Sequence, residues 1–267
     1  MKQKIAITGI GSISPLGDNQ KTIWKNYLTK GHFLQQQNYN GLDAITSPLS
    51  IELEKTIKEL KNSSKHYKKI DKTVLLSILA SRQATEQAGW NNEESFGVNI
   101  SSSRGATQLF EEFYDDFKEN KAHKSHPLSS PSTTLGNISS WVSQDLGNDG
   151  LSISHSITCS SALHSFLNGI AWINSGMANK FLVGGSEAPL TKFTIAQMKA
   201  LKIYADDFGT FPCKSLDLSK TKNTMCLGEG AVSFCLEKEG KNALAYIEGL
   251  GFATEKLTHG TSISDNG

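Results

Sequence analysis

The chain of 267 residues is 37% hydrophobic and 20% charged, so it can bury a sizeable core and is not a disordered protein. Its formal net charge of +1 excludes a global attraction to nucleic acid or to an anionic membrane, so any electrostatic docking must be local. Polar and glycine residues interrupt the apolar N-terminal segment, unlike the core of a secretory signal. No apolar run approaches the roughly 20 residues of a membrane helix. We therefore expect a cytoplasmic protein.

The first third of the chain predicts a strand followed by three helices. Residues 4–10 form an apolar run typical of a buried strand, and residues 18–28 predict a helix that Asp18 caps. The polar stretch from there to about residue 49 has no clear period and predicts a loop. Two further helical patterns occupy residues 51–60 and 74–88.

The alternation of strands and helices continues beyond residue 95. Residues 96–101 predict a second strand, and helical spacing covers residues 109–118 and 133–146. The segment LSISHSI, residues 151–157, alternates apolar and polar residues with the period of a strand. The period then changes to that of a helix, which runs through Ile173 and ends at Gly176.

The segment KFLVGGSEAP follows this helix and completes a strand, helix, strand unit, whose natural connection is a parallel pair. A helix over residues 195–204 comes next. The segments AVSFCLE and ALAYIEGLGF predict the last two strands. The pattern as a whole indicates an α/β fold.

Cys159 stands where the alternating strand becomes the periodic helix, so its side chain is expected at a helix N-terminus among unpaired backbone N–H groups. Such a position favours the thiolate, which is the nucleophilic form of cysteine. The same N–H groups can bind the oxyanion that forms when a thioester carbonyl is attacked. A buried structural cysteine is the alternative, but the flanking Thr158, Ser160 and Ser161 favour the nucleophile. The spacing of the four cysteines includes no C-x-x-C pair, so we expect neither a disulfide framework nor a metal site.

A Cys-His hydrolase would require an imidazole beside the sulfur. His155 lies four residues back along a strand, roughly 13 Å away at about 3.3 Å per residue. His164 lies five residues on, about 500° around a helix, and points to another face. We therefore expect both histidines to be structural.

Two weaker signals have plain interpretations. The segment GIGSIS resembles a dinucleotide-binding loop, but Ser14 replaces its third glycine and Pro15 follows directly, so nicotinamide binding is not expected. Lys65, Lys68 and Lys69 concentrate positive charge ahead of a helix, which by charge alone indicates a solvated surface.

Four segments together resemble the ketosynthases of the thiolase-like superfamily: ITGIGSISPLG, SITCSSALHSFLNGIAWINSG, FLVGGSEAP and LGEGAVSFCLE. The likeness implies a thiolase-like fold, a layered mixed sheet with helices, of which this chain is the N-terminal half. It divides the chain into residues 1–241, the ketosynthase N-terminal domain, and residues 242–267, the start of a truncated C-terminal half.

The resemblance also implies a β-ketoacyl synthase mechanism. Cys159 accepts an acyl chain from a carrier-protein thioester, and a malonyl unit then decarboxylates and attacks that acyl group. No cofactor is implied, since substrates arrive on the phosphopantetheine of the carrier. Acyl carrier proteins of this family are acidic and dock on basic residues ahead of the second long helix, which makes Lys65, Lys68 and Lys69 the expected carrier-binding residues.

The sequence also departs from the family pattern. The two family histidines that assist decarboxylation lie in the C-terminal half, which this chain does not reach, so the chain by itself is expected to lack condensing activity. His259 resembles a different family position, in a loop bordering the active site. Near Asp217 the segment KTKNTM replaces the family's Arg-Asp-Gly-Phe run, which leaves the acyl substrate open among fatty, polyene and polyketide chains.

Two alternatives remain beside the condensing enzyme. One is a non-catalytic, ketosynthase-like partner subunit, and the other is a thiolase-fold acyltransferase or hydrolase that does not condense. The family is generally dimeric through the strand before the nucleophile, here residues 151–157, so we expect a homodimer or a heterodimer with a ketosynthase-like subunit.

Overall fold

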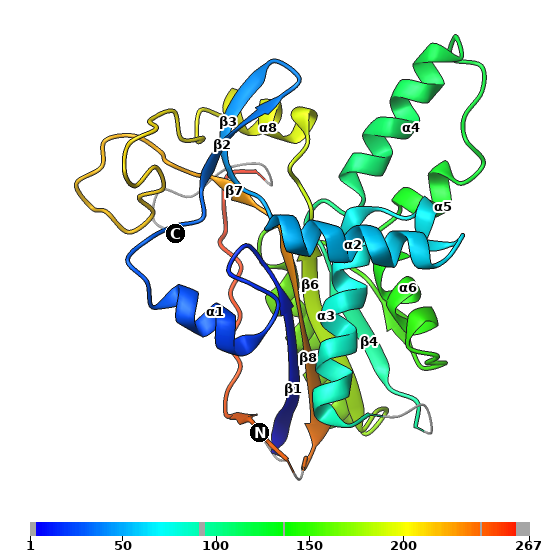
Figure 1. The fold of residues 1–267 in the computed structure, drawn as a ribbon. Coiled ribbons are helices and arrows are strands. Elements are labelled where there is room, and N and C mark those ends of the chain that lie inside the picture. The colour runs from blue at the N-terminus through cyan, green and yellow to red at the C-terminus, as the bar shows by residue number, and fades with distance from the viewer. Residues whose placement is uncertain (1–3, 91–93, 136, 241, 260–267) are drawn as a thin grey trace.

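The computed structural model describes residues 4–90, 94–135, 137–240 and 242–259. Within these ranges, a mixed sheet of six strands in the order β5-β4-β6-β8-β1-β9 runs through the molecule (Figure 1). Strands β4, β5 and β6 run parallel, whereas β8 is antiparallel to both β6 and β1. The strands in chain order are β1 (Ile5–Ile13), β4 (Gly97–Ser101), β5 (Ser152–Ile153), β6 (Lys180–Glu187), β8 (Gly230–Lys238) and β9 (Ala245–Ile247).

Two long helices, α3 (Lys72–Ala88) and α7 (Ser161–Ser175), cover opposite faces of this sheet. The side chains of β6 establish the arrangement, because successive residues of a strand point to opposite faces. Leu182 packs in the cluster that contains the buried residues of α3, whereas Phe181 and Val183 pack with the α7 residues Ile170 and Ile173. The core is therefore an α/β/α sandwich.

The α3 face carries two further helices, α2 (Ile51–Ser63) and α6 (Asn137–Asp145), which contribute buried apolar residues to the same cluster. Strand β1 lies very close to α3. A Cβ added at Gly11 would stand 1.8 Å from the Ala80 carbonyl oxygen, so only glycine permits this approach.

A smaller sheet of three strands lies at one end of the molecule within the described residues and includes a hairpin that the sequence did not predict. Strand β2 (Gln35–Tyr39) pairs antiparallel with β3 (Leu42–Ser47), and β3 pairs in parallel with β7 (Leu227–Gly228). The expected loop up to residue 49 is therefore wrong. Helix α8 (Lys192–Ala200) packs on this sheet around Ala44, Ile195 and Tyr204.

Most predicted helices are confirmed, with shifted ends. Helix α1 (Gln20–Tyr27) is capped by Asn19, whose side chain accepts a hydrogen bond from Thr22 N at 2.9 Å, rather than by Asp18. The helix expected from residue 133 begins at Asn137 and is preceded by the separate α5 (Ser129–Thr133). Helix α4 (Thr107–Glu119) and the short 3-10 helix η1 (Tyr67–Lys69) complete the set in the described ranges. None of the described helices is both long and apolar enough to cross a membrane.

The strand expected over residues 151–157 is mostly wrong, because only Ser152 and Ile153 pair in the sheet. Side-chain hydroxyls replace the ladder beyond them: Ser154 Oγ donates to Ser139 Oγ at 2.9 Å, and Ser156 Oγ donates to the Ser103 carbonyl at 3.0 Å. Strands β5 and β6 are parallel as expected, but they are not adjacent, since β4 lies between them.

Candidate active site

The candidate nucleophile Cys159 is exposed and lies in a tight turn directly before α7. The Ser161 backbone N–H donates to the Thr158 carbonyl at 3.1 Å, which closes the turn on the main chain. Ser160 occupies the N-cap position without a side-chain capping bond. The sequence placed Cys159 at the helix N-terminus, and the structure puts it one residue ahead of the cap.

Thr158 has a φ of 58°, a left-handed conformation that costs a β-branched residue of order 1–3 kcal/mol. Its hydroxyl donates to the Ile157 carbonyl at 2.7 Å, which helps to hold this conformation. The strain lies at the residue before the candidate nucleophile. Local strain of this kind is typical of positions where the chain is held in one geometry for function.

Cys159 borders a cavity of about 570 Å³ at the carboxyl ends of the parallel strands β4 and β6. Apolar residues from several segments line much of the cavity: Ile13, Ala162, Pro189, Met198, Met225 and Leu227. At the base, β6 runs close to the first turn of α7, because a Cβ added at Gly185 would stand 2.6 Å from Ala162 Cβ. An apolar cavity beside a thiol suits an acyl chain bound as a thioester.

Two charged residues in this cavity were missed by the sequence analysis. Glu187 accepts hydrogen bonds from Ser102 Oγ at 2.8 Å and from the Ser103 backbone N–H, and burial raises the pKa of its carboxyl. Arg104 lines the same cavity and donates from Nη2 to Gln197 Oε1. Arg104 follows the predicted strand of residues 96–101, and Glu187 is the last residue of β6. The rule that carboxyl ends of parallel strands meet at one edge of a sheet could have found them.

The structure supports a structural role for both nearby histidines. His155 Nδ1 lies 3.2 Å from Asn99 Nδ2, and burial lowers the pKa of the imidazole. His164 Nδ1 lies 3.1 Å from the Ser160 carbonyl oxygen, one turn back along its own helix. Neither belongs to the described residues that line the Cys159 cavity. His259 is exposed in the segment after β9 and is also outside that lining set.

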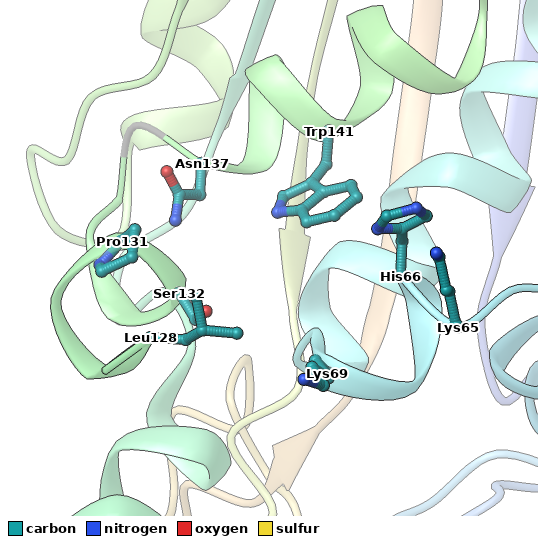
Figure 2. A pocket seen from close by; sticks show the side chains of 8 residues that line it. All are labelled: Lys65, His66, Lys69, Leu128, Pro131, Ser132, Asn137 and Trp141. Atoms are coloured by element: carbon teal, nitrogen blue, oxygen red, sulfur yellow. The ribbon is translucent and has the colours of Figure 1, made fainter. Parts of the chain in front are cut away.

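The three lysines expected to bind a carrier are exposed and lie ahead of α3, with Lys68 and Lys69 in η1 and Lys65 just before it. Lys65 and Lys69 line one side of a groove of about 590 Å³, whose opposite side comes from α5 and α6 (Figure 2). Leu128, Pro131 and Trp141 give that groove an apolar wall. Lys68 is not among the described residues that line it.

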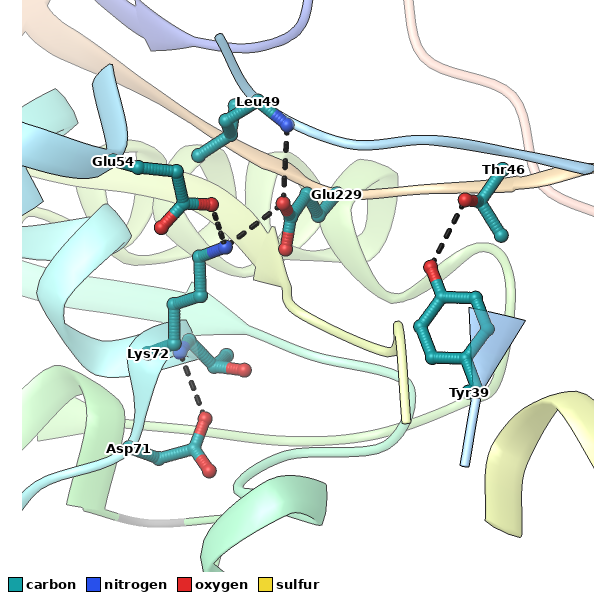
Figure 3. A network of polar contacts seen from close by, with 8 residues as sticks. Tyr39, Thr46, Leu49, Glu54, Asp71, Lys72 and Glu229 are labelled. Atoms are coloured by element: carbon teal, nitrogen blue, oxygen red, sulfur yellow. Dashed lines mark hydrogen bonds and ion pairs between the residues drawn. The ribbon is translucent and has the colours of Figure 1, made fainter. Parts of the chain in front are cut away.

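A partly buried ion network lies beside the cavity, because Gly228 and Gly230 line the cavity and Glu229, whose side chain is 3% exposed, stands between them. Lys72 Nζ donates to Glu229 Oε1 at 2.8 Å and to Glu54 Oε1 (Figure 3). Leu49 N also donates to Glu229 Oε1, at 3.1 Å. The network joins α2, α3 and the β7–β8 segment, so it fixes the glycines of the cavity wall.

Residues 2–242 match the sequence family described as "Beta-ketoacyl synthase, N-terminal domain". The chain belongs to the β-ketoacyl synthase family. Among curated relatives, Nodulation protein E of Rhizobium sp. (strain N33) is 27% identical over 265 residues, which cover 96% of this chain and 64% of the relative. The 3-oxoacyl-[acyl-carrier-protein] synthase 2 of Staphylococcus aureus (strain COL) is 27% identical over 273 residues, covering 94% of this chain and 63% of the relative.

Solved ketosynthase structures share the fold. The ishigamide ketosynthase/chain length factor superposes with a TM-score of 0.72 at 17% identity, over 89% of this chain and 59% of that one. A second structure is a type II polyketide acyl-carrier protein in complex with its ketosynthase bound to the hexaketide. It also gives a TM-score of 0.72, at 18% identity, over 89% of this chain and 58% of the matched chain. The thiolase-like α/β fold expected from the sequence is therefore confirmed. The chain spans less than two thirds of the length of the curated relatives it matches.

Proposed function

We propose that this chain carries the acyl-accepting site of a β-ketoacyl synthase, with Cys159 as the nucleophile. The whole protein would extend an acyl chain by decarboxylative condensation with a malonyl carrier, in fatty acid, polyene or polyketide biosynthesis. The observation that carries the proposal is the position of Cys159, in a strained turn before α7 and open to a largely apolar cavity.

The acyl-transfer step follows from this geometry. The Cys159 thiolate attacks the thioester carbonyl of an acyl carrier, and the carbonyl electrons move onto oxygen. The backbone N–H at position 159 and the positive end of α7 stabilise that oxyanion. When the carbonyl re-forms, the carrier thiolate leaves and the acyl group stays on Cys159 in the cavity.

Acylation by a pantetheine thioester tests this proposal. Incubation with a short-chain acyl-pantetheine, digestion and mass spectrometry should place the acyl group on Cys159, and Cys159→Ser should abolish the adduct. Cys213→Ser should leave the Cys159 adduct in place, because Cys213 is exposed but lies in a loop away from any helix N-terminus. Equal labelling of Cys159 and Cys213 by the acyl-pantetheine would contradict the proposal.

Reaction products separate the remaining alternatives. With malonyl carrier and the complete enzyme, a lengthened β-ketoacyl product indicates condensation, whereas free acid indicates hydrolysis. A non-catalytic partner subunit would give neither product and no adduct on Cys159.

We propose that an acidic acyl carrier protein docks at the groove beside Lys65 and Lys69, with Lys68 adding positive charge at its rim. The exposure of all three lysines and the groove of Figure 2 support this site. The triple exchange of Lys65, Lys68 and Lys69 to Glu should weaken carrier binding strongly in titration calorimetry. The control variant exchanges the exposed α2 residues Lys55, Lys58 and Lys61 to Glu. It makes the same change in net charge nearby and should keep most of the affinity for the carrier protein. Equal losses in the two variants would contradict a local site.

We also propose a dimer through the sheet edge at β5. Strand β5 is the outermost strand of the larger sheet, and Leu151 and Ile157 beside it are 40% and 41% exposed. Sedimentation equilibrium of the complete protein should give twice the mass of one chain, or the mass of a heterodimer with a ketosynthase-like subunit. The active-site loop at His259, the cytoplasmic location and the absence of a cofactor stay predictions from the sequence.

A further inference from the structure

Two cysteines that the proposed reaction does not use lie together at the edge of the candidate site. Cys213 lies close enough to Cys226 to raise the pKa of its thiol, and the Cys226 Sγ donates to the Thr224 carbonyl at 3.9 Å. Cys213 is exposed, whereas Cys226 is only partly accessible. A thiol pair with one accessible member is the arrangement in which a solution oxidant reaches the first sulfur and the second completes a disulfide.

The main chain on both sides holds this pair together. The Lys214 backbone N–H donates to Thr224 Oγ1 at 2.9 Å, which closes the loop between the two cysteines. Lys220 Nζ bonds the carbonyls of Lys214 and Ser215, each at 3.0 Å, so the middle of the loop folds back on its start. The loop fold therefore brings Cys213 and Cys226 close together.

The segment that carries Cys226 is anchored to the protein core. Met225 N donates to the Ile203 carbonyl at 3.0 Å, and Ala205 N donates to the Met225 carbonyl at 2.8 Å. Met225 and Leu227, on either side of Cys226, both line the Cys159 cavity. A covalent bond at Cys226 would therefore attach the exposed loop to the cavity wall.

We propose that Cys213 and Cys226 form a redox-active thiol pair, whose oxidation by a peroxide closes a disulfide that ties residues 213–226 to the wall of the Cys159 cavity. Cys213 is the sulfur that attacks the oxidant, since it is the exposed one. Burial raises the pKa of the Cys226 thiol to about 11, and the Cys213 sulfur adds to the rise, so Cys226 keeps its proton until the second step.

The oxidation balances in two steps. The Cys213 sulfur attacks one peroxide oxygen, the O–O bond breaks, and the products are a sulfenic acid on Cys213 and one water. The Cys226 sulfur then attacks the Cys213 sulfur, an S–S bond forms, and the sulfenic oxygen leaves with the Cys226 proton as a second water. Hydrogen peroxide is reduced as the two thiols are oxidised, and a small dithiol reverses the reaction by exchange.

The test is a disulfide map made in a Cys159→Ser background, which removes the other exposed thiol. The protein is treated with hydrogen peroxide, alkylated and digested. The two peptides joined through Cys213 and Cys226 should then weigh two hydrogens less than the sum of the same peptides in reduced form. Dithiothreitol should restore both thiols. The link should form at a rate independent of protein concentration, and several-fold more slowly in urea, because the loop fold supplies the contact.

Variants give the controls. Adding Cys213→Ser or Cys226→Ser should abolish the internal link, whereas Cys235→Ser, at a buried cysteine, should leave it unchanged. The proposal is overturned if Cys213 ends as a sulfinic acid while Cys226 can still be alkylated, or if cross-links form only between molecules. The readout is the mass of a peptide pair and not acyl transfer, so it stands apart from the function proposed above.

Discussion

The Ile157 backbone N–H donates to the Ser161 hydroxyl at 2.9 Å, across the turn that presents Cys159. The same hydroxyl donates onward to the Thr158 carbonyl at 2.6 Å. Ser161 is only 2% exposed, so water does not replace these bonds if they are lost. The geometry of the candidate nucleophile therefore depends on one buried side chain at the first position of α7.

Replacing Ser161 by Ala removes both bonds and leaves Thr158 in its strained conformation without this support. We expect the free energy of unfolding, measured with urea, to fall by about 1–3 kcal/mol, and acylation of Cys159 to slow. Ser160→Ala is the matched control, because the Ser160 hydroxyl makes only a 3.3 Å bond to the Ile157 carbonyl. Equal effects of the two changes would show that the Ser161 bonds do not hold the turn.

Glu187→Gln should change the pH dependence of stability. Burial raises the pKa of the Glu187 carboxyl above its ordinary 4.5, so the folded protein binds this proton more tightly than the unfolded chain does. The stabilisation from that proton is fully present below pH 4.5 and is lost as the pH rises through the folded pKa. The variant lacks this loss, so its free energy of unfolding relative to the wild type should rise from acid to neutral pH.

Urea titrations across that pH range measure the difference. Glu52→Gln supplies a control of opposite sign, since hydrogen bonds from its own backbone and from Ser50 lower the pKa of Glu52. The free energy of unfolding of Glu52→Gln, relative to the wild type, should fall as the pH rises. A flat difference for Glu187→Gln would contradict the assignment of a raised pKa to this cavity residue.

Glu229→Gln should destabilise the wall of the cavity. The Glu229 side chain is 3% exposed and pairs with Lys72, so the change leaves a largely buried ammonium with Glu54 as its remaining carboxylate partner in the network of Figure 3. Breaking a buried pair at one partner costs about 3 kcal/mol. Glu54 is 46% exposed, so Glu54→Gln should cost less than about 1 kcal/mol. Thermal and urea unfolding compare the two, and similar losses would argue against a buried network.

Local sequence patterns predicted the core of the fold because its helices carry clear periods and end signals. The helix after Cys159 ends at Gly176, which has a φ of 77° as a glycine C-cap requires. The hairpin β2–β3 was missed because its strands are mostly polar. Its turn, Asn40-Gly41, has φ values of 52° and 90°, and an Asn-Gly pair is the signal that could have revealed it.

The strand before Cys159 was overpredicted for a different physical reason. Its alternation is real, but the serines at the polar positions bond to Ser139 and to the Ser103 carbonyl, which belong to segments distant in sequence. The cavity is also non-local, since Arg104, Glu187 and Met225 meet only through the order of the strands. A sequence pattern places a residue at a strand end and cannot give its neighbours in the next strand.

The basic segment depends on a buried carboxylate for its position. The Asp145 side chain is 1% exposed and binds Arg82 through two bonds, from Nε at 2.8 Å and from Nη2 at 2.6 Å. Asp145 also accepts a hydrogen bond from the Tyr67 hydroxyl. Tyr67 lies between Lys65 and Lys69, so this contact attaches the lysine segment to α6 and the apolar side of the groove.

Asp145→Asn should therefore weaken carrier binding although every lysine remains. The change weakens the hydrogen bonds that a buried carboxylate accepts from Arg82 and Tyr67, but the Arg82 side chain is 46% exposed, so we expect the free energy of unfolding to fall by about 1–2 kcal/mol. Calorimetry well below the unfolding temperature should give a lower affinity for the carrier protein, because Lys65 and Lys69 are held less firmly. Asp115→Asn is the control, because it makes the same change in charge at a surface ion pair in which Asp115 is 67% exposed. It should change the free energy of unfolding and the carrier affinity only slightly. An unchanged affinity in a clearly destabilised Asp145→Asn protein would mean that the lysines bind the carrier without a fixed geometry.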